Sequence, residues 1–136
     1  MAFRFSCPVE VRFRDCDAMG HVNHAVYLTY LEVARFAYWH QVGGGRVFGD
    51  VSFIMARAEV DYKAPAKTGD ILQVRLATTT FGRTSFVFEY EVVDQNGRVI
   101  VTARTVQVMY DYTAGKPVPV PEAFRARISD YEGIRD

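Results

Sequence analysis

Ionisable and polar side chains are concentrated in ten residues, DCDAMGHVNH at 15–24, directly before the most apolar stretch of the chain. They include two carboxylates, Asp15 and Asp17, and two imidazoles, His21 and His24. A carboxylate placed beside an electrophilic carbonyl can attack it or activate a water molecule. Unpaired backbone N–H groups at the start of a following helix would favour negative charge. The same residue types are common in turns and caps, so spacing alone leaves a reactive site and a capped loop both open.

The stretch from His24 to Val42 predicts a core helix of about 19 residues and about 28 Å, because it contains no Pro or Gly and is apolar on nearly every side. Asn23 is a good N-cap residue, and the glycines at 43–45 end the helix. The polar residues form one stripe at i, i+3 spacing, made of Thr29, Glu32 and Arg35. Within it, Glu32 is expected to pair with Arg35. The helix is too short and too interrupted by charge to span a membrane.

Five further stretches predict strands, because apolar residues in them alternate with polar ones or run continuously. They cover residues 9–14, 51–63, 71–80, 84–93 and 98–110. Short turns with Gly, Pro or Asn-Gly join the last four. One strand, one helix and four consecutive strands predict an α+β domain in which an antiparallel sheet packs on one helix. Because one sheet covers only one side of the helix, its remaining apolar side predicts a partner subunit.

The length and composition favour one domain over residues 1–136, with an extended proline-rich tail from about residue 113 and a short helix at 121–132. Apolar residues make up 49% of the chain, which excludes a disordered protein. Sixteen basic and sixteen acidic residues give zero net charge without a basic block, so nucleic acid is not indicated as a partner. Cys7 and Cys16 fit neither a disulfide framework nor a zinc site. The N-terminus lacks the apolar segment of a signal peptide, so a cytoplasmic location is expected.

Three motifs occur in the order found in a known enzyme family. The first runs Arg14-Asp15-x-Asp17-x-x-Gly20-His21-Val22-Asn23-His24-x-x-Tyr27 into the helix, which carries Glu32 and Arg35 in the pattern LEVAR. The second is Phe53-Ile54-Met55, followed by VDYKAPA at 60–66 and Gly69-Asp70. The third is Arg83-Thr84-Ser85-Phe86. Over about residues 5–120 the chain resembles hotdog-fold acyl-CoA thioesterases of the 4-hydroxybenzoyl-CoA thioesterase-like family. The resemblance implies an α+β hotdog fold, with a five-stranded antiparallel sheet wrapped around one long central helix, in a homodimer or homotetramer.

The resemblance also implies an acyl-CoA thioester hydrolase in which Asp17 is the catalytic nucleophile or general base. His24 would orient water or the carboxylate, and the N–H groups of His24 and Ala25 would hold the oxyanion. Asp15 is better explained as a cap or as an ion-pair partner of Arg12 or Arg14. The remaining loop residues implied in substrate binding, which more simply shape the loop, are Gly20, His21 and Asn23.

Acyl and phosphate contacts follow from the same resemblance. The Phe53-Ile54-Met55 segment would line the acyl pocket at a subunit interface, and Tyr27 would either line that pocket or fill the core. Arg83, with Thr84 and Ser85, is the first candidate for the coenzyme A phosphates. Arg57 and Lys63 are the next candidates. No metal or organic cofactor is implied, since coenzyme A is part of the substrate.

Two other functions share this fold. A hotdog dehydratase would set its catalytic His and its Asp or Glu on other elements, and the Asp17 loop argues against it. A non-catalytic acyl-CoA sensor is the binding-module alternative, which the fold alone does not exclude. Turnover that depends on Asp17 separates the hydrolase from the sensor.

Overall fold

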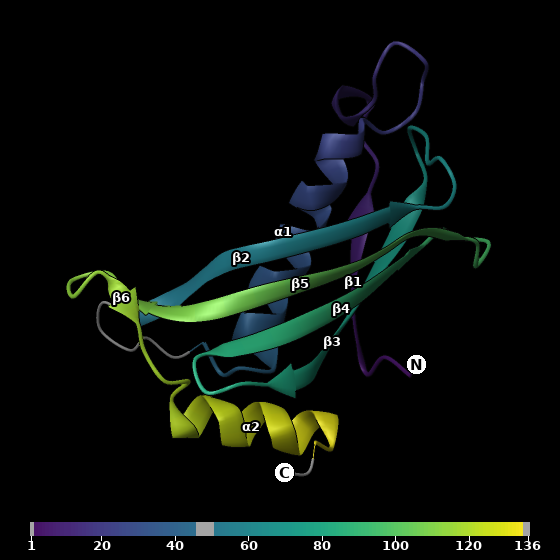
Figure 1. Ribbon diagram of the computed structural model, residues 1–136. Coiled ribbons are helices and arrows are strands. Elements are labelled where there is room, and N and C mark those ends of the chain that lie inside the picture. The colour runs from purple at the N-terminus through teal and green to yellow at the C-terminus, as the bar shows by residue number, and fades with distance from the viewer. Residues whose placement is uncertain (1, 46–50, 135–136) are drawn as a thin grey trace.

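One long helix crosses one face of an antiparallel sheet in the computed structural model, which describes residues 2–45 and 51–134 (Figure 1). The order of elements is β1 (Phe5–Glu10), the 3-10 turn η1 (Phe13–Asp15), α1 (His24–Gln41), β2 (Val51–Tyr62), β3 (Ile71–Phe81), β4 (Ser85–Val93), β5 (Val99–Asp111), β6 (Lys116–Pro117) and α2 (Glu122–Glu132). The strands lie side by side as β1-β3-β4-β5-β2, with β6 pairing to β5. This is the predicted α+β hotdog arrangement, extended by the two-residue strand β6.

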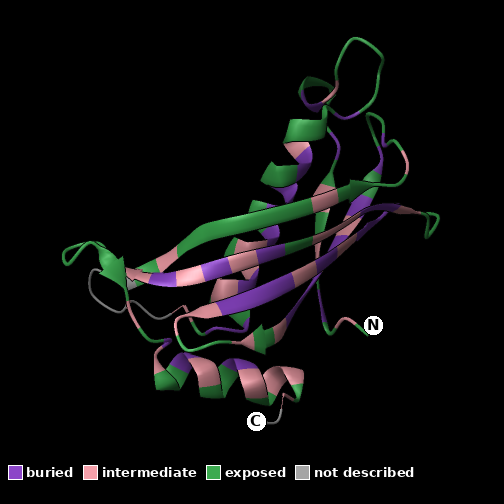
Figure 2. Cartoon of the chain, viewed as in Figure 1, coloured by how far each residue is buried: buried purple, intermediate pink, exposed green. Residues whose placement is uncertain are grey.

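The core lies between α1 and the inner face of the sheet. Leu72, Val74 and Leu76 of β3 are all fully buried, as their alternation predicts. The side of α1 that faces them presents Tyr27, Tyr30, Leu31, Ala34 and Tyr38. Its opposite side remains open in the single chain, where Phe36 is 68% exposed and Leu28 and Val33 are each 44% exposed. Figure 2 shows this division, with buried residues on β3, β4 and β5 and exposed residues along β2.

The first strand differs from the prediction. It spans Phe5–Glu10, whereas the alternating residues 9–14 were predicted to form it. The chain leaves the sheet at Val11, whose N–H donates to the Asp70 carbonyl at 2.9 Å, and then turns through η1. Phe13 is 84% exposed as a result. The prediction was wrong because alternation alone does not reveal that Asp15 holds this segment in a turn by accepting from the Arg12 N–H.

The second strand carries a bulge. Its register against β5 shifts between Met55 and Arg57, so Ala56 is the extra residue. Phe53 and Met55 therefore share the inner face with Ala58, Val60 and Tyr62, whereas unbroken alternation placed them on opposite faces. The bulge brings two large apolar side chains over α1.

Helix α2 lies across the end of the sheet near the C-terminal end of α1 (Figure 1). It buries Phe124 and Ile128. Pro121, predicted as its first residue, is its N-cap, so the helix begins one residue later than predicted, at Glu122. Within the described residues, no helix has both the length and the apolarity needed to cross a membrane.

Candidate active site

The loop that joins η1 to α1 lies at one end of the long helix (Figure 1), and Asp17 in this loop is exposed. The Asp17 N–H donates to the His21 carbonyl at 2.9 Å, and the Asp17 carbonyl accepts from the Gly20 N–H at 3.0 Å. One oxygen of the Asp17 carboxylate accepts from the Met19 N–H at 2.9 Å. Gly20 has a φ of 81°, a conformation that favours glycine and closes this turn. The side chain of Asp17 is thus held at the surface.

Asp15 lies only two residues away but is 4% exposed. Its carboxylate accepts from the Arg12 N–H at 3.0 Å, from the Arg12 guanidinium at 3.1 Å and from the Tyr30 hydroxyl at 2.8 Å. Burial alone would raise the pKa of Asp15, but these hydrogen bonds outweigh it and lower the pKa. The Asp15 carbonyl also accepts from the Asn23 N–H at 2.9 Å. Asp15 therefore ties the start of the loop to its end.

The turn at residues 63–70 supports the back of the loop. The Val22 N–H donates to the Ala66 carbonyl at 2.9 Å, His21 pairs with Lys67 in an isolated bridge, and the Cys16 thiol lies 3.3 Å from the Thr68 hydroxyl. Tyr27 is 3% exposed, and its hydroxyl accepts from the Ala66 N–H at 3.2 Å. Burial, as the main cause, raises the pKa of Tyr27. Of the two roles expected for Tyr27, these contacts favour core packing beneath the loop.

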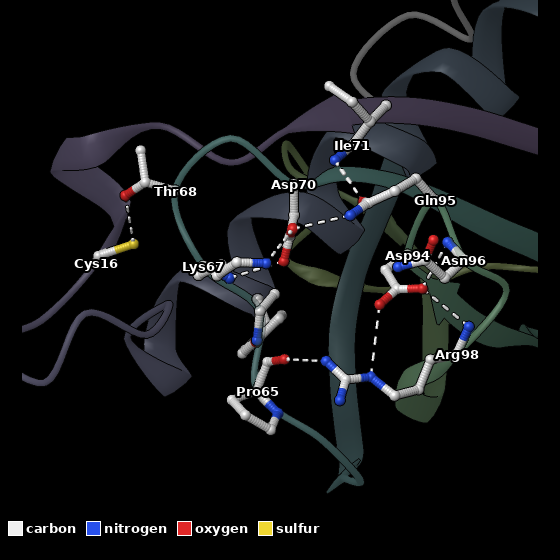
Figure 3. A network of polar contacts seen from close by, with 12 residues as sticks. Cys16, Pro65, Lys67, Thr68, Asp70, Ile71, Asp94, Gln95, Asn96 and Arg98 are labelled. Carbon is white, nitrogen blue, oxygen red and sulfur yellow. Dashed lines mark hydrogen bonds and ion pairs between the residues drawn. The ribbon is translucent and has the colours of Figure 1, made fainter.

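Two buried carboxylates hold this supporting turn in place (Figure 3). Asp70 accepts from the Lys67 N–H at 2.9 Å, from the Lys67 ammonium at 3.1 Å and from the Gln95 amide at 3.1 Å. Burial would raise the pKa of Asp70, yet these hydrogen bonds lower it. Asp94 pairs with Arg98 at 3.5 Å, and the Arg98 guanidinium donates to the Pro65 carbonyl at 3.1 Å. The sequence pattern placed Asp70 and Asp94 in turns, but it does not reveal that these two turns meet.

The start of α1 offers one free donor. Asn23 is the N-cap, as predicted, with its side chain accepting from the Ala25 N–H at 3.0 Å. The Val26 N–H donates to the Asn23 carbonyl at 2.9 Å. Among the described residues the His24 N–H has no acceptor. The expectation that Ala25 supplies an oxyanion donor is therefore wrong for this capped state, and His24 is the donor that remains.

Tyr62, at the end of β2, contacts the start of α1, which the sequence did not reveal. Its hydroxyl donates to the His24 carbonyl at 3.0 Å. Its ring meets the His24 ring edge-on at 6.3 Å and the Tyr27 ring at 5.7 Å. The alternation of β2 placed Tyr62 on the inner face but carried no signal that its hydroxyl reaches the helix start. Tyr62 joins β2 to the first turn of α1.

A groove of about 530 Å³ runs between α1 and β2 on the open side of the helix. Its walls are formed by Glu32, Arg35, Phe36, Trp39, His40, Ser52, Phe53 and Met55. The ion pair predicted between Glu32 and Arg35 is absent from the described part of the chain. Arg35 instead donates to the buried Tyr90 hydroxyl at 3.3 Å. The groove is therefore lined by aromatic rings, with the polar side chains of Glu32 and Arg35 on one side.

The predicted phosphate-binding residues do not gather around Asp17 within one chain. The segment Arg83-Thr84-Ser85 lies in the β3–β4 turn beside α2, at the opposite end of the molecule from the Asp17 loop (Figure 1). Arg57 points from the outer face of β2 and pairs with Glu59 at 2.8 Å. Lys63 directly follows β2 at the Asp17 end and is exposed. Of the three predicted cations, Lys63 alone lies at that end.

Known proteins resemble the chain over most of its length. A family model described as the thioesterase-like superfamily matches residues 11–128. The acyl-CoA thioester hydrolase YbgC of Escherichia coli is 30% identical over 125 residues, covering 90% of this chain and 93% of the relative. A 1,4-dihydroxy-2-naphthoyl-CoA hydrolase of Synechococcus elongatus is 32% identical over 117 residues, covering 82% of this chain and 85% of the relative.

Solved thioesterase structures share the fold of this chain. A thioesterase of Thermus thermophilus, crystallised with coenzyme A and zinc, superposes with a TM-score of 0.85 at 38% identity, covering 98% of both chains. A 1,4-dihydroxy-2-naphthoyl-CoA thioesterase of Synechocystis superposes with a TM-score of 0.82 at 24% identity, covering 93% of this chain and 96% of the other. In the described part of the present chain, no three His, Cys, Asp or Glu side chains lie close enough together to share a metal ion.

Proposed function

Because the chain belongs to the thioesterase-like superfamily, we propose that it hydrolyses acyl-CoA thioesters to the free acid and coenzyme A. The observation that carries this proposal is the position of Asp17, which is exposed in a loop that leads directly into a helix start with the unpaired His24 N–H. The relative solved with coenzyme A supports the choice of thioester.

In the proposed reaction, Asp17 either attacks the thioester carbonyl carbon or takes a proton from an attacking water molecule. The carbonyl π electrons move onto oxygen, where the His24 N–H and the positive end of the α1 dipole stabilise the negative charge. Collapse of this intermediate breaks the carbon–sulfur bond and releases coenzyme A as a thiolate. The attack by Asp17 gives an anhydride that water then hydrolyses, whereas the attack by water gives the acid directly.

The acyl group would occupy the seam between α1 and β2. At one end of this seam Tyr62 contacts His24, and at the other Phe53 and Met55 face the second half of α1. Small Ala58 lies between these ends on the inner face of β2. Lys63, which is exposed at the His24 end, would contact the phosphates of coenzyme A.

A second copy of the chain would complete the assembly. The free edge of β2 and the exposed apolar residues of α1, Leu28, Val33 and Phe36, form an uncovered surface in the single chain. We propose a homodimer through this surface, with a tetramer as its larger form. In such an assembly Arg83, Thr84 and Ser85 would act only at a partner's site. A cytoplasmic location remains part of this proposal.

The proposal is tested by thiol release from a panel of short, long and aromatic acyl-CoA thioesters. Hydrolysis of at least one thioester, with stoichiometric free acid, is the expected result. Binding of acyl-CoA without thiol release from any thioester would instead support the sensor function. The acyl preference found in the panel then guides the choice of substrate for every variant discussed below.

A further inference from the structure

Four aromatic rings from four different elements form a closed cycle at one side of the groove. The ring centroids of Trp39 and Phe53 lie 5.3 Å apart, and those of Phe53 and Phe86 lie 5.6 Å apart. Phe86 lies 5.5 Å from Phe124, and Phe124 lies 5.0 Å from Trp39. All four spacings are those of directly packed aromatic pairs. The cycle joins α1, β2, β4 and α2.

The four rings divide into an outer and an inner pair. Trp39 and Phe53 line the groove and are partly exposed. Phe86 and Phe124 are 0% and 1% exposed and do not line it. The outer pair therefore forms a wall of the groove, and the inner pair supports that wall from behind.

Phe124 is the part of this support that comes from α2, and α2 is firmly attached. The Arg127 guanidinium donates to the Val42 carbonyl at 2.8 Å, and Glu132 accepts from the Tyr38 hydroxyl and from the Thr78 N–H. A Cβ atom at Gly43 would lie 3.1 Å from the Phe124 ring and 2.7 Å from the Trp39 carbonyl oxygen. The ring thus fits against the end of α1 where only a glycine leaves room.

The wall stands far along the seam from the proposed reaction centre. Trp39 follows His24 by 15 residues, which is about 22 Å of helix at 1.5 Å per residue. An extended acyl chain that starts at the His24 N–H and follows the seam meets Trp39 and Phe53 at its far end. A longer chain would have to displace rings that are packed on both sides, which densely packed interiors resist.

We propose that Phe124 sets the longest acyl chain that the groove accepts, because it holds Trp39 and Phe53 in place from behind. This inference rests on the proposed binding of acyl-CoA in the same groove. Phe124 is a positioning residue here: it touches the wall and not the substrate. Its removal leaves space into which Trp39 can withdraw, so the accepted chain becomes longer.

Trp39 provides a direct readout, since it is the single tryptophan of the chain. The experiment titrates Trp39 fluorescence with saturated acyl-CoAs of even chain length from acetyl to lignoceroyl, which extends past the wall, with free coenzyme A as the probe that lacks an acyl group. The same series is measured as kcat/KM wherever turnover occurs. In the wild type, affinity is expected to rise with chain length and then to fall once the chain reaches the wall.

Phe124→Ala is expected to move this maximum to longer chains by two or more carbons, and to raise relative binding of the first rejected chain about tenfold. Phe124→Leu, a milder change, should give a smaller shift in the same direction and serves if the alanine variant does not fold. An unchanged maximum in the folded variant overturns the inference. The fluorescence series decides it even if no thioester is hydrolysed, so failure of the proposed function is recognised separately. A wild type that binds none of the series overturns both.

Phe5→Ala is the matched control. Phe5 is also a buried ring, 5% exposed. Among the described residues its ring packs 5.3 Å from Tyr38 and forms no ring contact with the four rings of the wall. Loss of Phe5 should therefore reduce stability while leaving the chain-length maximum unchanged. A shift of equal size in Phe5→Ala would show general loosening of the core and would contradict a specific role for Phe124.

Discussion

The Tyr30 hydroxyl donates a hydrogen bond of 2.8 Å to the buried carboxylate of Asp15. This contact fixes the first aspartate of the loop in the core, and the second aspartate, Asp17, is left at the surface. The two carboxylates are close in sequence but have different environments. Asp15 stabilises the loop, and Asp17 is available for chemistry.

Replacing Asp15 by Asn should destabilise the protein by about 2 kcal/mol at pH 7, because it weakens charge-assisted hydrogen bonds to Arg12 and Tyr30. The folded-state pKa of Asp15 lies below its unfolded value of about 3.9, so its contribution is present above that value and is lost as the pH falls through the folded-state pKa. Chemical denaturation of wild type and Asp15→Asn, repeated from pH 7 to pH 3, measures the free energy of unfolding of each. The difference between wild type and variant should shrink in acid; a difference that grows would contradict this role.

Tyr62→Phe removes the hydroxyl that donates to the His24 carbonyl and keeps the ring. Because a typical hydrogen bond contributes about 1 kcal/mol, we expect kcat to fall about fivefold as the first turn of α1 becomes less well positioned. KM should change little, since the ring still lines the seam. Steady-state kinetics check this. A rise in KM with an unchanged kcat would instead assign Tyr62 to ground-state binding.

Lys63→Ala should raise KM for acyl-CoA several-fold, because Lys63 lies at the Asp17 end of the chain and would contact phosphate. Arg83→Ala is the comparison, since Arg83 lies at the opposite end beside α2. We expect the smaller effect on KM for Arg83→Ala. The reverse order would show that a partner's β3–β4 turn supplies the main phosphate contact.

Val33→Glu places a charge on the open face of α1, where Val33 is 44% exposed and does not line the groove. If a second copy covers this face, the burial of an unpaired carboxylate should shift the protein to monomers at micromolar concentration. Light scattering after size-exclusion chromatography measures the mass. The reference variant is Glu10→Gln, an exposed position on β1 at the other edge of the sheet. An unchanged mass for Val33→Glu would contradict the proposed interface.

Most of the fold could be predicted from local pattern. The limits of β2, β3, β4 and β5 agree with the alternating stretches to within one residue, and Asn23 caps α1 as its type suggests. The alternating pattern gave a wrong prediction at two places where a local contact or a bulge changes the path of the chain. Asp15 turns the chain at residues that read as a strand, and the bulge at Ala56 reverses the faces of β2.

The sequence predicted which loop carries the candidate site, but it did not predict which other segments contact that loop. Residue type and order indicated that Asp17 precedes a helix start, which the structure also places there. The contacts of Tyr62 with His24 and of Ala66 with Val22 join segments that lie about 40 residues apart in sequence. No periodicity encodes such contacts. For the same reason, residue type favoured Arg83 as a phosphate contact, although the β3–β4 turn that contains it lies at the opposite end of the molecule from the Asp17 loop.

The most direct test of the proposed function compares thiol release by wild type, Asp17→Asn and Asp61→Asn with the best acyl-CoA of the panel. Asp61 is an exposed carboxylate on the outer face of β2, so its variant controls for the loss of one surface charge. We expect kcat to fall at least a hundredfold in Asp17→Asn, with unchanged thermal unfolding, and to stay at the wild-type value in Asp61→Asn. Full turnover by a folded Asp17→Asn protein would contradict the assignment of Asp17 as the catalytic carboxylate.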